Sequence, residues 1–278
     1  MKRIPLVKPL LFAALLTAGA GTLQAAPDAR QVLAVSPIDD IVAQYPAMMS
    51  QGIRQGLKQS GQLPPMVAGT IGTLVSNSFS AADIEQQIVT DLSEKLTPAQ
   101  LQTVHDWYQT PVARKISAAE IAASSPESWQ SVQARAPELN ERFKGTRKAE
   151  MFDRFDRAAR ATESAVDTSI AVQLGLASAM AAFSNDSANY EQLRQRIEGQ
   201  RSMLRGVVGQ QVYDSYLYTY ESISAQEMDL YLAFLESPAG SAFSRVVTNS
   251  IQQAITEPVV TIGKQMSRFL SPESPAGQ

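Results

Sequence analysis

The sequence has 278 residues, with 24 Lys and Arg against 27 Asp and Glu, a formal charge of −3, one histidine and no cysteine. Without cysteine, disulfide bonds and thiolate chemistry are excluded, and a single histidine nearly excludes a zinc site of the usual ligand types. A mildly acidic chain also lacks the electrostatic footprint of a nucleic-acid-binding protein. We therefore expect no metal, no cofactor and no nucleic-acid partner, and a fold that depends on its hydrophobic core.

Residues 1–25 have the pattern of a secretory signal peptide. Lys2, Arg3 and Lys8 form a positive N-terminal region, a short apolar stretch follows, and small residues lead to Ala25, after which we expect cleavage. A membrane anchor is the alternative, but glycine and threonine interrupt the apolar stretch before it reaches the ~20 residues that a span needs. The mature chain, with a formal charge of −6, is predicted to be periplasmic or secreted and to have no membrane span.

Helical periodicity dominates the first half of the chain. Residues 26–37 are predicted to form an extended lead-in, 38–57 a helix that Pro46 breaks or kinks, and 66–79 a helix rich in small residues. Another helix is expected to begin at Ser80, a residue type that caps helix N-termini. No strand-like alternation extends beyond a few residues, so the predicted fold class is all-α.

The first distinctive motif contains two helix starts in succession. Thr97 and Gln100 have the spacing of a capping box, in which each side chain satisfies a free backbone N–H, and Pro98 occupies the first helical position. The dipeptide Thr110-Pro111 repeats the start signal. Because a residue before proline is pushed out of the helical region, we expect a turn there and a second helix after it.

The stretch from 137 to 160 is the most charged part of the chain. Its acid-first pairs at i,i+4 predict a solvated helix that joins the two halves. These pairs are Glu150–Arg154, Asp153–Arg157 and Asp156–Arg160. The alternative is an anion site, which interleaved charge of both signs disfavours. Its candidate residues are Arg142, Lys144, Arg147 and Lys148.

Helices are also predicted in the second half, near 166–183, 188–199 and 203–220. Four tyrosines cluster at the end of the last of these helices. They are Tyr213, Tyr216, Tyr218 and Tyr220. Aromatic residues at such spacings are typical of a core or its edge, and a ligand groove is the alternative interpretation.

A second copy of the first motif lies 127 residues further along the chain. Ser224 and Glu227 repeat the capping box, and Ser237-Pro238 repeats the second helix start, 13 residues after the first cap in both copies. Large apolar residues hold corresponding positions, Trp107 and Tyr108 in the first copy, Phe234 and Leu235 in the second. The shared spacing predicts a duplicated helical repeat that forms an antiparallel bundle, either compact or bilobed.

The two copies also carry a family resemblance. The pattern Leu-Thr-Pro-x-x-Leu, an aromatic pair, then Thr/Ser-Pro-x-Ala/Gly resembles the bacterial family called domain of unknown function 2059. The first copy departs from the family at Ala113, where glycine is common, and the second at Leu235, where tyrosine is common. The resemblance implies an exported helical protein and brings no catalytic residues with it.

These signals divide the chain into five parts. They are a signal peptide (1–25), the lead-in (26–37), a first helical repeat (38–136), a second helical repeat that includes the charged connecting helix (137–270), and a disordered tail (271–278).

No group of residues defines a reaction. His105 would have to serve any Ser-His-Asp arrangement, but the adjacent Asp106 faces another direction on the helix, and no Gly-x-Ser-x-Gly elbow presents a nucleophile. Glycan cleavage needs only a pair of carboxylates. Candidates for such a pair are Asp39, Asp40, Glu94 and Glu120. Because acidic residues on amphipathic helices are usually solvated, we assign no catalytic, binding or metal-ligating residue.

The sequence therefore favours a non-enzymatic binding or interaction module of the cell envelope. Its partner would be a protein, a peptide or an apolar small molecule. A purely structural or stress-related envelope protein is the alternative, and a carboxylate-dependent glycan hydrolase is the third hypothesis.

Overall fold

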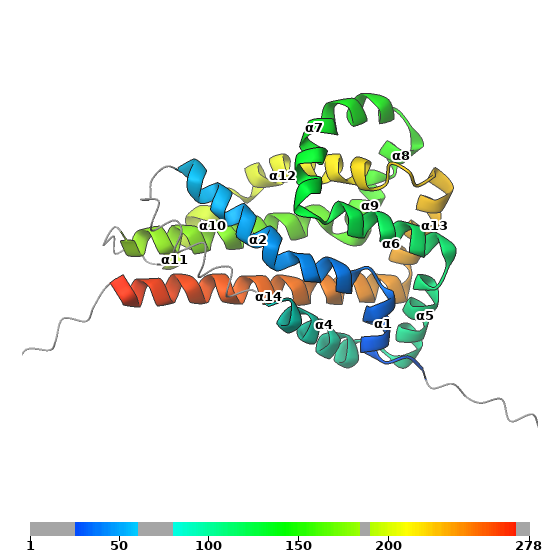
Figure 1. Ribbon diagram of the computed structural model, residues 1–278, viewed down its shortest axis with the longest axis horizontal. Coiled ribbons are helices and arrows are strands. Elements are labelled where there is room, and N and C mark those ends of the chain that lie inside the picture. Colours follow the sequence, from blue (N-terminus) through cyan, green and yellow to red (C-terminus); the bar gives the residue numbers. More distant parts are fainter. Residues whose placement is uncertain (1–25, 61–79, 184–189, 271–278) are drawn as a thin grey trace, which may run out of the picture.

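The computed structural model describes residues 26–60, 80–183 and 190–270, and all regular structure in these ranges is α-helical (Figure 1). The predicted all-α fold class is therefore confirmed. The predicted signal peptide, the small-residue helix at 66–79 and the tail at 271–278 lie outside the described residues.

The predicted extended lead-in is wrong, because a short helix, α1 (Ala29–Val35), forms there. Asp28 closes a capping box with Gln31: its carboxylate accepts from the Gln31 N–H at 2.8 Å, and the Gln31 amide oxygen accepts from the Asp28 N–H at 2.9 Å. The helix buries Ala29, Val32 and Leu33, which the sequence analysis did not recognise as one apolar face.

The next helices begin where the sequence predicts. They are α2 (Ile38–Ser60), α4 (Ala81–Lys95), α5 (Pro98–Tyr108), α6 (Pro111–Ala123) and α7 (Pro126–Phe143). Pro46 lies inside α2, which continues through it. The predicted boundary between residues 136 and 137 likewise falls within α7, which runs on through Pro137.

The prediction of one continuous connecting helix is wrong. The chain forms α8 (Arg147–Glu150) and α9 (Phe152–Ala159), which are separated from each other at Met151. Gly145 and Arg160 both have positive φ, 67° and 55°, and these left-handed residues interrupt the helical path on either side. The charged segment therefore folds back on the bundle as short pieces.

Five further helices lie in the described residues after Arg160. They are α10 (Ala161–Phe183), α11 (Tyr190–Glu198), α12 (Arg201–Thr219), α13 (Ala225–Glu236) and α14 (Pro238–Leu270). Helix α14 extends along the length of the bundle, and α10 and α4 pack against it (Figure 1).

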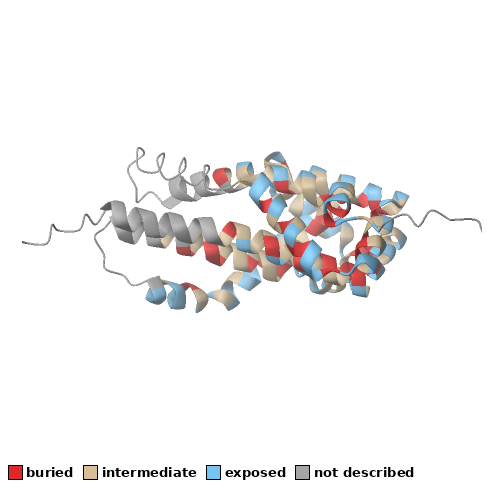
Figure 2. Ribbon diagram, turned by 90° about the horizontal axis from the view of Figure 1, so that it is seen from below, coloured by how far each residue is buried: buried red, intermediate tan, exposed pale blue. Residues whose placement is uncertain are grey.

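Both motif copies contribute to one continuous core, and buried residues line the helix faces that meet inside it (Figure 2). Leu101, Val104 and Tyr108 come from the first copy, and Met228 and Phe234 are among those from the second. A smaller apolar cluster joins α10, α11 and α12. It consists of Val166, Ile170, Leu174, Ile197 and Val208.

Three of the four large apolar residues at corresponding positions of the two copies are buried. Tyr108, Phe234 and Leu235 are buried. Trp107 keeps partial exposure, and its ring stacks on Phe234 with 4.7 Å between the ring centroids. The tryptophan therefore covers the edge of the core.

The two corners between paired helices share their hydrogen bonds but differ in tightness. The Thr110 hydroxyl accepts from the Ala113 N–H at 3.1 Å, and the Ser237 hydroxyl accepts from the Gly240 N–H at 3.0 Å. Helix α13 has 12 residues where α5 has 11, so Ser237 alone separates α13 from α14, whereas two residues separate α5 from α6. A Cβ on Gly240 would overlap the Phe234 carbonyl oxygen and lie 2.7 Å from its carbon. The second corner therefore requires glycine.

We predict that Gly240→Ala destabilises the protein by about 1–3 kcal/mol, the typical cost of overpacking. This loss would occur although alanine is the better helix former by about 1 kcal/mol. Gly206→Ala is the matched control, because nothing lies within 4 Å of a Cβ at that position in α12. It should stabilise the protein by up to about 1 kcal/mol. Urea unfolding of both variants makes the comparison, and equal effects would contradict the tight corner.

Candidate functional site

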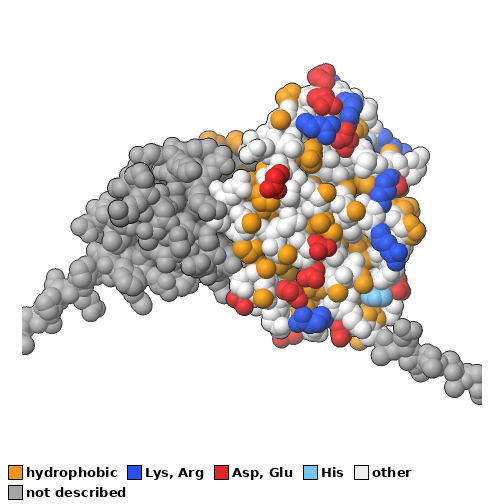
Figure 3. All heavy atoms as spheres, viewed as in Figure 1, with side chains coloured by type: hydrophobic (Ala, Val, Ile, Leu, Met, Phe, Trp, Pro, Cys, Tyr) orange, Lys and Arg blue, Asp and Glu red, His pale blue; other side chains and the backbone are white. Residues whose placement is uncertain are grey.

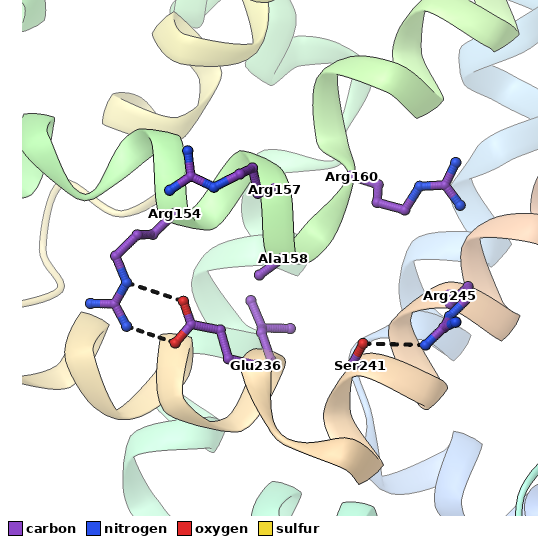
Figure 4. A pocket seen from close by; sticks show the side chains of 8 residues that line it. Arg154, Arg157, Ala158, Arg160, Glu236, Ser241 and Arg245 are labelled. Atoms are coloured by element: carbon purple, nitrogen blue, oxygen red, sulfur yellow. Dashed lines mark hydrogen bonds and ion pairs between the residues drawn. The ribbon is translucent and has the colours of Figure 1, made fainter.

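A cavity of about 430 Å³ opens between α9, α13 and α14 (Figure 4). Its lining consists of Arg154, Arg157, Ala158, Arg160, Leu235, Glu236, Ser241 and Arg245. Helix α9 and the residue after it form one wall, and the second corner with the first turns of α14 forms the other. The candidate site, called the arginine cavity below, thus depends on both the charged segment and the second motif copy.

The end of α9 places Arg160 in the cavity wall. Arg160 is the C-cap of α9 and has φ 55° and ψ 34°, a left-handed conformation that L-residues other than glycine rarely adopt. After it, the Asp156 carboxylate accepts a hydrogen bond of 2.6 Å from the Thr162 N–H near the start of α10. The left-handed residue therefore ends the helix and turns the Arg160 side chain away from the path of α9 (Figure 4).

One of the four arginines is paired across the cavity. Arg154 donates to both Glu236 carboxylate oxygens, at 3.1 Å from Nε and 2.7 Å from Nη2. These bonds lower the pKa of Glu236. The predicted Glu150–Arg154 pair does not form, because α8 and α9 are separate helices and Arg154 reaches α13 instead.

The other three arginines have no ion pair with any described residue, and these are Arg157, Arg160 and Arg245. The predicted pairs of Asp153 with Arg157 and of Asp156 with Arg160 are therefore not formed. For the second pair the reason is that Asp156 caps α10 while Arg160 leaves the helix. With four arginines and one glutamate, the lining has a formal charge of +3.

The cations that the sequence analysis considered for an anion site are engaged elsewhere. Arg142 pairs with Glu221, Lys144 lies 3.5 Å from Glu141, and Arg147 pairs with Asp229. Lys148 is only 7% exposed, and its ammonium donates to the Tyr220 and Glu221 carbonyls at 2.7 and 2.9 Å. Burial lowers the pKa of Lys148. None of these four cations lines the arginine cavity.

A half-buried carboxyl group joins the two halves of the chain. Glu120 Oε1 on α6 accepts from the Tyr220 hydroxyl at 2.6 Å and the Tyr231 hydroxyl at 2.7 Å. Burial raises the pKa of Glu120, although both tyrosine bonds act in the opposite direction. The corresponding position in the second copy is Val247, which is buried. The sequence comparison of the two copies could have singled out Glu120 by this difference.

The candidate carboxylates for glycan cleavage lie on separate elements. The pKa of Glu120 responds to burial and the two tyrosines alone among the described residues. Asp39 and Asp40 lie in the first turn of α2. The pKa of Asp39 is raised, first by burial and then by the negative charges of Glu85 and Asp40. Arg30 forms an ion pair with Glu85. Glu94 is exposed on α4. None of these four carboxylates lines the arginine cavity, so they do not form the pair of facing acidic groups that glycan cleavage would need there.

His105 and the tyrosine cluster also have ordinary packing positions. The His105 Nδ1 atom lies 3.7 Å from Asp106 Oδ1 and, within the described residues, has no hydrogen-bond partner. Tyr216 and Tyr220 are buried in the core, and Tyr213 and Tyr218 pack against it. The core interpretation of these tyrosines is confirmed.

Across the described ranges, no group of three or more His, Asp or Glu side chains is arranged to hold a metal ion. No helix in these ranges has an apolar stretch that would cross a bilayer. On the face seen in Figure 3, acidic and basic side chains are interleaved among apolar ones, without a continuous field of one sign.

The fold and the cavity define an α-helical bundle with an arginine-lined cavity beside its second corner. Residues 82–142 match the model of a family described as an uncharacterized protein conserved in bacteria, DUF2059. This match confirms the predicted family resemblance, over a segment that holds the first motif copy. No curated protein and no solved structure shows significant similarity to the chain. The cavity residues lie outside the matched segment.

We predict that Glu120→Gln flattens the pH dependence of stability. A carboxyl whose pKa is raised in the folded state above its usual 4.5 contributes stability below pH 4.5, and loses it as the pH rises through the folded-state pKa. Glutamine accepts the tyrosine bonds without titrating. The melting temperature of the variant, relative to that of the natural protein, should therefore increase as the pH is raised from about 4 to about 8.

Glu120→Val is the control, because valine stands at the matching position of the second copy. It leaves two tyrosine hydroxyls without their acceptor and should be less stable than Glu120→Gln by about 1–3 kcal/mol at every pH. Parallel pH profiles for the natural protein and Glu120→Gln would show that the carboxyl does not titrate in this range.

Proposed function

We propose that this protein is an exported, non-enzymatic binding protein whose ligand is a small anion held in the arginine cavity. The observation that carries the proposal is the charge of that cavity, where four arginines face one glutamate. Arginine is the side chain best suited to carboxylate and phosphate groups, because its planar fork of N–H donors matches their oxygens.

The composition of the lining favours an anion over the apolar ligand that the sequence suggested. Among its described residues, Ala158 and Leu235 are the apolar ones. A cavity of about 430 Å³ lies within the range of small-molecule sites, which are mostly apolar with a few placed polar groups. Here the lining is about as polar as it is apolar and carries a net positive charge, so recognition would depend on charge.

Export is supported by the sequence. Residues 1–25 have the charge, apolar stretch and cleavage pattern of a signal peptide, and the resemblance to the matched family implies an exported protein. The proposed location is the periplasm or the extracellular space. A purely structural role in the envelope is the alternative.

Native mass spectrometry of the protein, purified gently from its own envelope compartment, tests this proposal. We expect a chain that begins at Ala26 and carries an anionic adduct that is lost on denaturation. The double variant Arg157→Gln/Arg245→Gln should lack the adduct. Arg114→Gln removes one charge from α6, outside the cavity, and should retain it.

Each alternative outcome is informative. A bare mass for the natural protein, together with a melting temperature that added anions do not change, would favour the structural role. A chain that retains residues 1–25 would contradict export by signal cleavage.

A further inference from the structure

We propose that the ligand of the arginine cavity is a phosphomonoester, a dianionic phosphoryl group attached to a small polar molecule. This inference rests on the proposed function, since it specifies which anion the cavity binds. The phosphoryl group would lie between Arg160 and Arg245, and the rest of the molecule would extend toward Glu236.

The first argument is the distribution of charge within the cavity. Figure 4 shows Arg154 and Glu236 together at one end, and Arg160 and Arg245 at the other, with Ala158 between. The Arg154–Glu236 pair largely cancels its own charge, and Arg157, whose charge also lowers the pKa of Glu236, leaves one positive charge near that end. The opposite end has two guanidinium groups without an ion-pair partner among the described residues. A ligand that matches this arrangement has its negative charge at one end.

The second argument is the number of donors at the charged end. Arg160 and Arg245 each carry a fork of N–H groups, and Ser241 adds a hydroxyl from the first turns of α14. A carboxylate offers two oxygens, whereas a phosphoryl group offers three strong acceptors and up to two charges. The positive end of the α14 dipole lies on the same side and also favours an anion.

The third argument is size. A cavity of about 430 Å³ has room for more than an inorganic phosphate, and it falls in the range of sites for small organic molecules. Leu235 and Ala158 form a short apolar surface between the two ends. Glu236 can accept hydrogen bonds from hydroxyl groups of the ligand. These features fit a phosphorylated polyol better than a free ion.

The fourth argument is the backbone of Arg160. It is the one residue other than glycine with positive φ in the described part of the chain. Glycine would adopt this conformation without the steric cost that a side chain incurs. On stability alone, glycine would be the favoured residue at this position, but the chain has an arginine there and its side chain lines the cavity. Backbone strain of this kind is frequent at ligand sites.

Isothermal titration calorimetry of the mature protein with glycerol 3-phosphate at about pH 7.5 and low salt tests the proposal. We expect binding that is at least about tenfold tighter than that of acetate or succinate. Arg160→Gly and Arg245→Gln should each weaken it by about tenfold or more, as expected for the loss of a charge-assisted contact. Arg114→Gln should have no effect.

Arg160→Gly also separates binding from folding. Because glycine relieves the left-handed strain, this variant should melt at the same or a higher temperature than the natural protein. Weaker binding with unreduced stability would therefore identify Arg160 as a ligand-binding residue. A lower melting temperature would overturn the claim of strain, and unchanged binding would overturn the placement of the phosphoryl group.

The pH dependence gives an independent result. The charged groups facing the ligand are the four arginines, Glu236 on α13, and Asp229 next to Arg154. Arginines stay charged, and the bonds from Arg154 lower the pKa of Glu236. The second pKa of a phosphomonoester is about 6. Affinity should therefore fall between about pH 7.5 and pH 5, as the ligand loses its second charge.

The outcomes distinguish this inference from the proposed function. If acetate or succinate binds as tightly as glycerol 3-phosphate, the phosphomonoester is excluded and a generic anion site remains. If no anion binds, both proposals fail. Vesicles containing phosphatidic acid present the same group on a lipid, so binding to them but not to glycerol 3-phosphate would assign the site to a lipid headgroup.

Discussion

In the described part of the chain a new helix begins after each serine or threonine that precedes proline, and the position of the cavity depends on that constraint. The residue before proline leaves the helical region, and its hydroxyl accepts from the new helix. At Ser237-Pro238 the restart follows directly on the end of α13, and Gly240 lets the two backbones come close. This tight corner orients α14 so that Ser241 and Arg245 face α9. The cavity therefore results from a turn that is encoded locally.

The two motif copies are similar in their caps and corners and different in their interiors. Val247 in the second copy is replaced by Glu120 in the first, and the carboxyl binds two tyrosines of the second half. A half-buried carboxyl is costly unless it is hydrogen-bonded, so its two bonds favour the packing that brings the tyrosines of the second half to α6. On the surface, Lys115 of α6 also pairs with Glu227, the capping-box residue of the second copy, at 2.8 Å. The halves are therefore complementary to each other, and neither presents a complete core alone.

Local signals in the sequence predicted most helix starts, because caps and prolines act within a few residues. The errors arose where tertiary contacts decide. Arg154 was expected to bind Glu150 on its own helix, but its partner is Glu236, 82 residues away. Arg160 was expected on a continuous helix face, but it is left-handed, and no turn-forming residue type announced that conformation. The cavity was therefore not predictable from periodicity, although the abundance of arginine at 154–160 was visible. Glu120 could have been found by aligning the two copies.

Helix α14 has 33 residues, which at 1.5 Å per residue makes a rod about 50 Å long. Its first turns line the cavity, and further along the Ser250 hydroxyl donates to Asp91 of α4 at 2.6 Å. Asp91 also accepts from Lys95 within α4, so the Ser250 hydroxyl meets an acceptor that is already held in place. In the turns of α14 that line the cavity, Phe243, Val246 and Val247 are buried in the core, whereas Arg245 lies in the cavity lining. One helix therefore presents an apolar face to the core and a positively charged face to the cavity, so the same turns serve both packing and the proposed site.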